Sequence, residues 1–193
     1  GSGGFLYKAR EAGWQVMGVD MDSDAVANAQ KLGVEVYQGT TEIFDAEVGS
    51  FDAITLNHVI EHVPEPSELL SMAQRLLKPG GTLYIDTPNI QSSGARIFGP
   101  NWRGIETPRH LVLFSRIGLQ QLLTKHDFTD FQLKYRRKSK DMFLQSYLLT
   151  LGVSPHSPTP KSLPLDLALR TKIPFTVPDR LEFITLLARK KIL

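Results

Sequence analysis

The strongest constraint on the fold is a regular alternation of short strand-like and helix-like segments in the first two-thirds of the chain. Short apolar, β-rich runs are typical of buried parallel strands, and the segments between them carry apolar residues at helical spacing. The expected strands are 15–20, 34–38, 51–57 and 82–87, and the expected helices are 5–12, 23–32 and 66–77. With such short connections, this alternation predicts an α/β fold, a mostly parallel sheet with helices on both faces.

The last third follows a different pattern. A helix is expected over 115–125, a strand over 128–137 and a final strand over 181–189. Between them, many of the 12 prolines gather, which predicts an irregular insertion at about 139–178 with one short helix near 165–171.

Composition excludes several classes of protein. A net charge of +2 gives no strong field for nucleic acid, and the absence of cysteine rules out disulfides, thiolate metal sites and a cysteine nucleophile. No stretch approaches the roughly 20 apolar residues of a membrane span, and from these residues we expect no signal peptide. We therefore expect a cytoplasmic protein with no integral membrane segment and no nucleic-acid partner.

The opening glycines resemble a ligand-binding turn. Gly1-Ser2-Gly3-Gly4 precedes a helix and then a strand that ends in Asp20. Glycine lets a backbone approach a ligand closely, and an acidic residue ending the second strand can accept hydrogen bonds from ribose hydroxyls. The same signal suits a nicotinamide enzyme, and an aspartate here can also simply cap the next helix. Because a strand should precede such a turn, we expect the first strand of the sheet to be missing, the alternative being an added glycine linker.

More specific motifs follow in a fixed order. They are Gly1-Ser2-Gly3-Gly4-Phe5, Gly18-Val19-Asp20, Phe51-Asp52-Ala53-Ile54, Glu61-His62-Val63-Pro64, Leu77-Lys78-Pro79-Gly80-Gly81, Asn101-Trp102-Arg103-Gly104, Pro108-Arg109-His110-Leu111 and Phe114-Ser115. Together they resemble the class I S-adenosylmethionine-dependent methyltransferases, in particular the group that includes ubiquinone-biosynthesis and other small-molecule O-methyltransferases. The resemblance runs from residue 1 to about 137.

The resemblance implies a Rossmann-like sandwich whose last strand is antiparallel. It implies one domain over 1–193, with a cofactor-binding half at 1–90 and a substrate-side half at 91–193. S-adenosylmethionine would be the cofactor, its methionine part over the opening glycines, its ribose on Asp20 and its sulfonium beside the end of strand 51–57. The implied cofactor residues are Gly1, Ser2, Gly3, Asp20, Met21, Thr40, Thr41, Asn57 and His58. Thr40 and Thr41 depart from the family, which often has an aspartate there for the adenine.

Transfer to a hydroxyl needs a base, and histidine titrates in the suitable range. His110 is the first choice and His58 the second. Trp102 would give the acceptor a flat apolar wall, and Arg103 or Arg109 would pair with an anionic acceptor. The alternative is that Pro108-Arg109-His110 is a structural turn that anchors the next helix.

Two further patterns have plainer interpretations. If this stretch is helical, His58, Glu61 and His62 share one face and could hold a divalent metal; the same spacing serves capping and packing, so we expect no metal. The basic runs Arg136-Arg137-Lys138 and Arg189-Lys190-Lys191 are expected to be solvated strand ends.

The sequence thus predicts methyl transfer from S-adenosylmethionine to an oxygen of a small-molecule acceptor, by a monomer or homodimer. One alternative is a catalytically inactive methyltransferase-like binding domain. Another is a nicotinamide-dependent oxidoreductase or epimerase, although neither Tyr84 nor Tyr147 has the lysine four residues later that such enzymes use.

Overall fold

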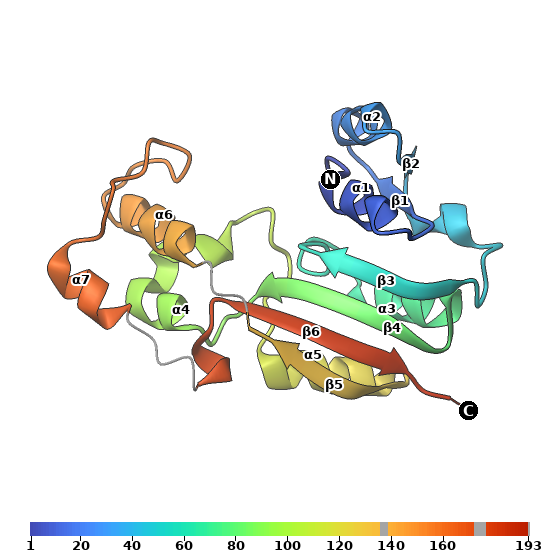
Figure 1. Ribbon diagram of the computed structural model, residues 1–193. Helices are drawn as coiled ribbons and strands as arrows, with labels where there is room; N and C mark the ends of the chain where they lie inside the picture. The colour runs from blue at the N-terminus through green and yellow to red at the C-terminus, as the bar shows by residue number, and fades with distance from the viewer. Residues whose placement is uncertain (136–138, 172–176, 193) are drawn as a thin grey trace. The chain divides into compact units, whose positions relative to one another are not determined.

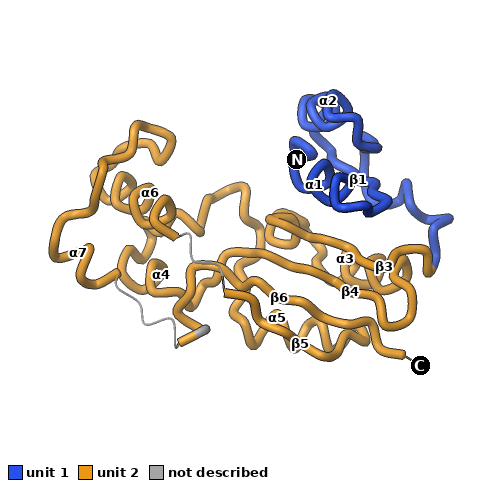
Figure 2. The backbone as a smooth tube through the Cα atoms, viewed as in Figure 1, with its two compact units in different colours: residues 1–48 blue, residues 49–193 orange. Residues whose placement is uncertain are grey.

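A computed structural model describes residues 1–135, 139–171 and 177–192, and these form two compact units, residues 1–48 and 49–193 (Figures 1 and 2). Each unit has its own sheet and its own apolar core. No helix among the described residues is both long enough and apolar enough to cross a membrane.

The first unit is a small βα arrangement. Its elements are α1 (Gly4–Glu11), β1 (Met17–Asp20), α2 (Ser23–Lys31), β2 (Glu35–Gln38) and the 3₁₀ turn η1 (Thr41–Phe44). β1 and β2 pair in parallel, with Asp20 opposite Gln38. The buried core is small and aliphatic; it consists of Val26, Ala29, Val34 and Val36. Because the strands are parallel, both end at the same edge of the sheet.

The second unit carries a four-stranded mixed sheet in the order β3-β4-β6-β5. Its strands are β3 (Phe51–Asn57), β4 (Leu77–Pro88), β5 (Phe128–Lys134) and β6 (Phe183–Lys190). Its helices and 3₁₀ turns are α3 (Pro66–Leu76), α4 (Ser93–Phe98), η2 (Gly99–Asn101), η3 (Arg103–Ile105), α5 (Arg116–Lys125), α6 (Lys140–Thr150), α7 (Leu165–Arg170) and η4 (Pro178–Arg180). β3 and β4 are parallel, whereas β6 runs antiparallel to both of its neighbours, which confirms the antiparallel last strand.

One apolar core lies between this sheet and two helices. Leu70 of α3 and Leu119 of α5 are fully buried in the same cluster as Leu83 and Leu186 of the sheet. Figure 1 shows both helices behind the sheet, on one face. Each such leucine contributes about 1.5–3 kcal/mol when it leaves water, so this layer is the main support for the strand ends described below.

Two expectations about local structure were wrong. The expected gap between helix 66–77 and strand 82–87 is absent; β4 already begins at Leu77, and its pairing with β3 has a register shift between Phe51 and Ala53. The insertion at 139–178 is not irregular throughout. It begins with the 11-residue helix α6, which buries Phe143 and Leu148, whereas the short helix α7 was expected.

Candidate active site

In the first unit, the predicted cofactor residues gather at the carboxyl ends of β1 and β2. The Gly39 amide, just after β2, donates to the backbone carbonyl of Asp20 at 3.0 Å. Met21 follows Asp20 with 76% of its surface exposed, and Thr40 precedes the turn η1. Ligands of open α/β sheets bind at this edge. The structure therefore brings Asp20, Met21 and Thr40 to one edge of one small sheet.

Asp20 does not cap the following helix. The N-cap of α2 is Asp22, whose carboxylate accepts from the amides of Asp24 and Ala25. The Asp20 carboxylate accepts from the Asp22 amide at 2.9 Å, contacts the amino group of Gly1 and is 27% exposed. Since capping is done by a neighbour, the Asp20 carboxylate has no structural duty in α2 and suits a ligand rich in hydroxyl groups.

Gly3 is the most constrained of the opening glycines. Its φ is +77°, in the left-handed region, and a Cβ there would lie 2.6 Å from the Cβ of Ala29. Any side chain would therefore push the opening turn away from α2. At Gly1, by contrast, no atom lies within 4 Å of the position that a Cβ would take, so this residue keeps an open face.

In the second unit, His58 follows β3 in an unusual backbone conformation. Its φ is +53°, and its amide donates to the backbone carbonyl of Asp86 at 2.8 Å. Non-glycine residues with positive φ are uncommon and concentrate at functional sites. The helical conformation on which the metal alternative depended is absent over 58–62, and these residues form a bend followed by a turn. That turn places the ring 36% exposed at the carboxyl end of the strand.

The ring of His58 is held by a buried carboxylate. Its Nδ1 lies 3.1 Å from Oε1 of Glu61, which is 0% exposed, and Oε2 of Glu61 accepts from the Thr87 hydroxyl at 2.9 Å. Burial acts to raise the pKa of Glu61, but the hydrogen bonds from His58, its own amide and Thr87 outweigh burial and hold that pKa below its usual value. An ionised Glu61 only accepts, so Nδ1 of His58 carries the proton and a neutral ring has its lone pair at Nε2.

A polar hollow of about 360 Å³ lies on the sheet beside these residues. It is lined by Asn57, Tyr84, Asp86, Lys134, Tyr135 and Thr185, which come from all four strands or their ends. Asp86 is 2% exposed, accepts from the Thr185 hydroxyl at 2.6 Å and lies 3.7 Å from Nε2 of His58. The predicted residue Asn57 thus lines a hollow that a small polar molecule can enter.

The Glu61-His62 and Arg109-His110 motifs, far apart in the sequence, meet in the second unit. The Leu111 amide donates to the Glu61 carbonyl at 2.8 Å, and the two imidazole rings lie 4.7 Å apart. Nδ1 of His62 contacts the Arg109 carbonyl at 2.8 Å. The side chain of His110 is 5% exposed, with its Nδ1 2.7 Å from the Gly104 carbonyl. Both rings therefore tie the 104–111 stretch to the turn after β3.

Charged groups cluster around Glu106 in this stretch. Nη1 of Arg103 lies 2.6 Å and Nη1 of Arg109 3.0 Å from its carboxylate, and Nε2 of His110 lies 3.6 Å from it. Burial acts to raise the pKa of Glu106, and the hydrogen bond and charge of Arg103, helped by His110 and Arg109, more than reverse that effect and lower it. Nε of Arg103 is buried with no hydrogen-bond partner among the described residues. Two arginines share one carboxylate, so a positive charge is left over.

Trp102 lies deeper than the sequence suggested. It is 1% exposed, packs with Phe98 and Phe143, and donates its indole N–H to Oε2 of Glu182 at 2.8 Å. A side chain on Gly104 would collide with its ring. Contact between Trp102 and an acceptor stays a prediction; in this conformation the ring has no free face.

One group in the described part of the chain has metal-binding geometry. Ligand atoms of Glu61, His62 and His110 all lie within 4.8 Å of one another. This set differs from the trio considered from spacing alone, because His110 takes the place of His58. Both oxygens of Glu61 already accept hydrogen bonds, so the geometry serves equally to fasten the two motifs together.

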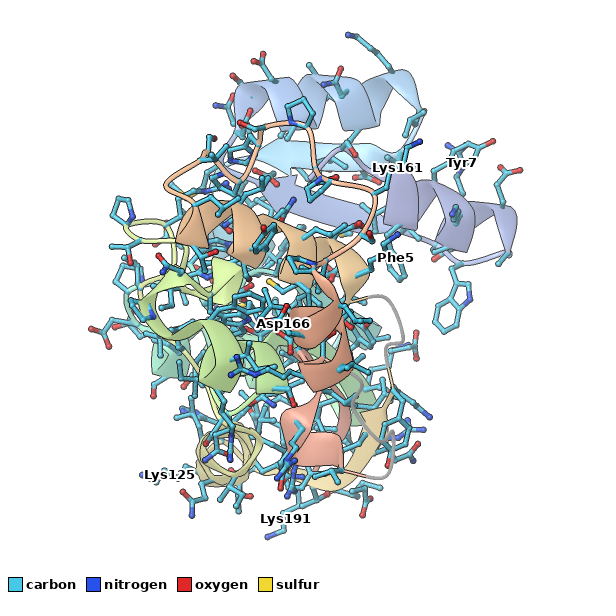
Figure 3. The ribbon with its side chains drawn as sticks, turned by 90° about the vertical axis from the view of Figure 1, so that its left-hand side faces the viewer. Phe5, Tyr7, Lys125, Lys161, Asp166 and Lys191 are labelled. Carbon is cyan, nitrogen blue, oxygen red and sulfur yellow. The ribbon has the colours of Figure 1, made fainter. Side chains whose placement is uncertain are left out.

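The structure describes one of the two basic runs. Arg136-Arg137-Lys138 lies outside the described residues. At the end of β6, Arg189 donates to the Gly80 carbonyl at 3.0 Å and Lys190 to the Leu77 carbonyl at 2.8 Å, whereas Lys191 points outward, as does Lys125 (Figure 3).

Sequence reasoning missed two buried acids, Asp86 and Glu182. Asp86 stands near the carboxyl end of an apolar strand, a position that could have singled it out. Glu182 offered a weaker signal, a lone acid at the start of an apolar run.

The methyltransferase domain family matches residues 1–133, and the chain belongs to this family. The resemblance inferred from the motifs is thereby confirmed. The curated relatives include a ubiquinone biosynthesis O-methyltransferase of Methylococcus capsulatus, 35% identical over 95 residues, which are 45% of this chain and 40% of that protein. The chain thus spans less than half the length of the curated relatives it matches.

Solved structures support the Rossmann-like methyltransferase fold. An S-adenosylmethionine-dependent methyltransferase of Thermotoga maritima, a possible histamine N-methyltransferase, matches with a TM-score of 0.66 at 23% identity, over 99% of this chain and 78% of that one. The [4+2]-cyclase SpnF matches with a TM-score of 0.65 at 18% identity, over 100% of this chain and 72% of that one. Since a cyclase shares the fold, the fold alone does not fix the reaction.

Proposed function

We propose that the protein transfers a methyl group from S-adenosylmethionine to an oxygen of a small-molecule acceptor. The observation that carries this proposal is the placement of His58. This residue has a positive φ at the carboxyl end of β3, and the buried Glu61 holds its ring beside a polar hollow. Family membership favours this reaction over nicotinamide chemistry.

The residues of the first unit fit the cofactor. A partly exposed carboxylate at the end of β1, which is not used as a helix cap, is the acceptor that two ribose hydroxyls require, and Gly3 keeps the opening turn close to α2. When bound, S-adenosylmethionine supplies an activated methyl group on a sulfonium. Asp20 would hold the ribose, with Met21 and Thr40 near the base. Gly1, Ser2 and Thr41 complete this predicted set.

In the second unit, we assign the general base to His58 and not to His110. A base must reach its proton within about 3 Å, and the side chain of His110 is 5% exposed with Nδ1 on a backbone carbonyl. His58 is 36% exposed, and Glu61 fixes its tautomer so that Nε2 accepts the proton. His110 then acts by fastening the 104–111 stretch.

The surplus positive charge at Arg103 and Arg109 favours an acceptor with an anionic or strongly polar group. The similarity to O-methyltransferases supports oxygen as the methylated atom. Nothing in the described residues favours a nucleic-acid partner, and a small acceptor matches the size of the polar hollow.

Calorimetry followed by a transfer assay tests the proposal. The protein is titrated with S-adenosylhomocysteine and with NAD, and is then incubated with methyl-labelled S-adenosylmethionine and a panel of phenols, amines and carboxylic acids. Binding of the first nucleoside alone, with label on a phenol, supports the proposal. Binding with no transfer supports the inactive binding domain, and no binding refutes both.

A further inference from the structure

Glu182 is a buried carboxylate that the proposed chemistry does not use. It stands just before β6, is 2% exposed and accepts three hydrogen bonds from residues 80 to 90 positions earlier. The Gly94 amide donates to Oε1 at 2.7 Å, and the Trp102 indole donates to Oε2 at 2.8 Å, with the Ser92 hydroxyl at 3.3 Å. None of these donors is charged, so the carboxylate is retained here without the compensation of a cation.

The three donors all belong to the segment 92–110. Ser92 is the N-cap of α4 and Gly94 lies in its first turn, while Trp102 begins the stretch that carries Arg103 and His110. A Cβ on Gly94 would collide with the Glu182 carboxylate, so the fit at this point is specific to glycine. In Figure 1, α4 lies beside the start of β6, the strand that Glu182 directly precedes.

From Trp102 the contacts continue to the candidate site. Its ring packs on Gly104, the Gly104 carbonyl receives Nδ1 of His110, and the His110 ring contacts His62. Glu61, next to His62, holds His58. Every link is a direct contact within the second unit.

We propose that Glu182 is a positioning residue that fastens the segment 92–110 to β6 and thereby sets the placement of His110 and the neighbouring arginines. Only a carboxylate accepts at two oxygens without bringing a donor of its own, so it alone satisfies the Gly94 and Trp102 donors together. The proposal rests on the proposed function in one respect only, namely that the segment 92–110 contributes to methyl transfer. The fastening itself is tested without any cofactor or acceptor.

Tryptophan fluorescence provides the test, because the chain has two tryptophans and Trp14 is exposed. In a W14F background, Trp102 is the sole reporter, and iodide quenching measures its exposure. We expect E182A to raise the quenching constant about threefold or more, because three donors lose their acceptor. E182Q should give an intermediate rise, since an amide accepts at one oxygen only.

A second variant leaves the carboxylate in place. G94A should raise the quenching constant as E182A does, because its Cβ displaces Glu182. D179N is the matched control: it lies in the same stretch and pairs with Arg116, so quenching should not change. The imidazole Nδ1–H resonance of His110, assigned with H110N, should shift or exchange faster in E182A and G94A.

Unchanged quenching and an unchanged His110 resonance in folded G94A and E182Q would overturn the proposal, as would an equal rise in D179N. If E182A does not fold, those two variants still decide. If the unsubstituted protein does not bind S-adenosylhomocysteine, the proposed function is refuted. The quenching result on Glu182 still stands in that case.

Discussion

The second unit contains two buried glutamates whose pKa values are shifted in opposite directions. Glu61, after β3, contacts the titratable ring of His58, and its pKa is lowered. Glu182, before β6, meets only neutral donors; burial dominates there and raises its pKa, although the bonds from Gly94, Trp102 and Ser92 oppose it. Two acids that are almost equally buried therefore have pKa values shifted in opposite directions. What decides the outcome is whether the donors compensate for the lost water.

Glu61 and Glu182 therefore suit different roles. An acid held ionised beside a histidine suits proton transfer, because it fixes the tautomer and stabilises the protonated ring. An acid that meets only neutral donors suits fastening, because both of its oxygens accept hydrogen bonds from one distant segment.

The largest effect is expected at the proton-transfer site. H58N should lower the rate of methyl transfer by about 10²–10⁴-fold, the usual worth of a general base. Asparagine tolerates positive φ, so the fold should survive. Steady-state rates with labelled cofactor measure the loss. H110N is the matched variant, and a greater loss of rate in H110N than in H58N would reverse the assignment.

The next effect concerns stability. E61Q leaves either His58 or Thr87 without its acceptor and should cost about 1–3 kcal/mol in free energy of unfolding at pH 7. E182Q should cost less, because it also removes a charge that the folded state disfavours. Urea denaturation of both variants gives the order. The comparison fails if E182Q is the more damaging change.

The pH dependence of stability should distinguish the two acids by sign. Because the folded pKa of Glu61 is lowered, its contribution is present above its usual pKa and is lost as pH falls through the folded value. Because the folded pKa of Glu182 is raised, its contribution is present at low pH and is lost as pH rises through the folded value. A plot of melting temperature against pH should therefore become flatter at acidic pH in E61Q. In E182Q it should become flatter at higher pH. A change at the same end in both variants would contradict the comparison.

The smallest effect is expected at Asp179. The Arg116 guanidinium, by its hydrogen bond, lowers the pKa of Asp179, but this carboxylate is 42% exposed. Exposed ion pairs contribute about 0–1 kcal/mol, so D179N should change the free energy of unfolding by no more than that. A loss as large as that of E61Q would show that the stretch before β6 is held by Asp179 and not by Glu182.

Much of the fold followed from the sequence, because local patterns decide it. The run 51–57 became β3 with the expected bounds, and α3 and α5 lie within a residue or so of theirs. The segment 92–104 was not anticipated, since its short turns depend on Glu182, about 80 to 90 residues away.

The site was predictable to a similar extent. The motifs identified His58, Glu61 and His110, but not their relations. His58 meets Glu61 through a turn and not a helix, and the burial of His110 depends on the Gly104 carbonyl. Helical spacing in the sequence reports neighbours along a regular helix, whereas both of these contacts depend on the geometry of irregular turns.

The fastening of the segment 92–110 by the start of β6 has a consequence for biosynthesis. Chains leave the ribosome from the N-terminus, at about 5–20 residues per second. Ser92, Gly94 and Trp102 therefore emerge seconds before Glu182, and β6, which sits between β4 and β5, emerges after both. A nascent chain that ends before residue 182 has every histidine of the candidate site but lacks the carboxylate that accepts from Gly94 and Trp102, so the proposed fastening of the segment 92–110 forms only when the last strand emerges.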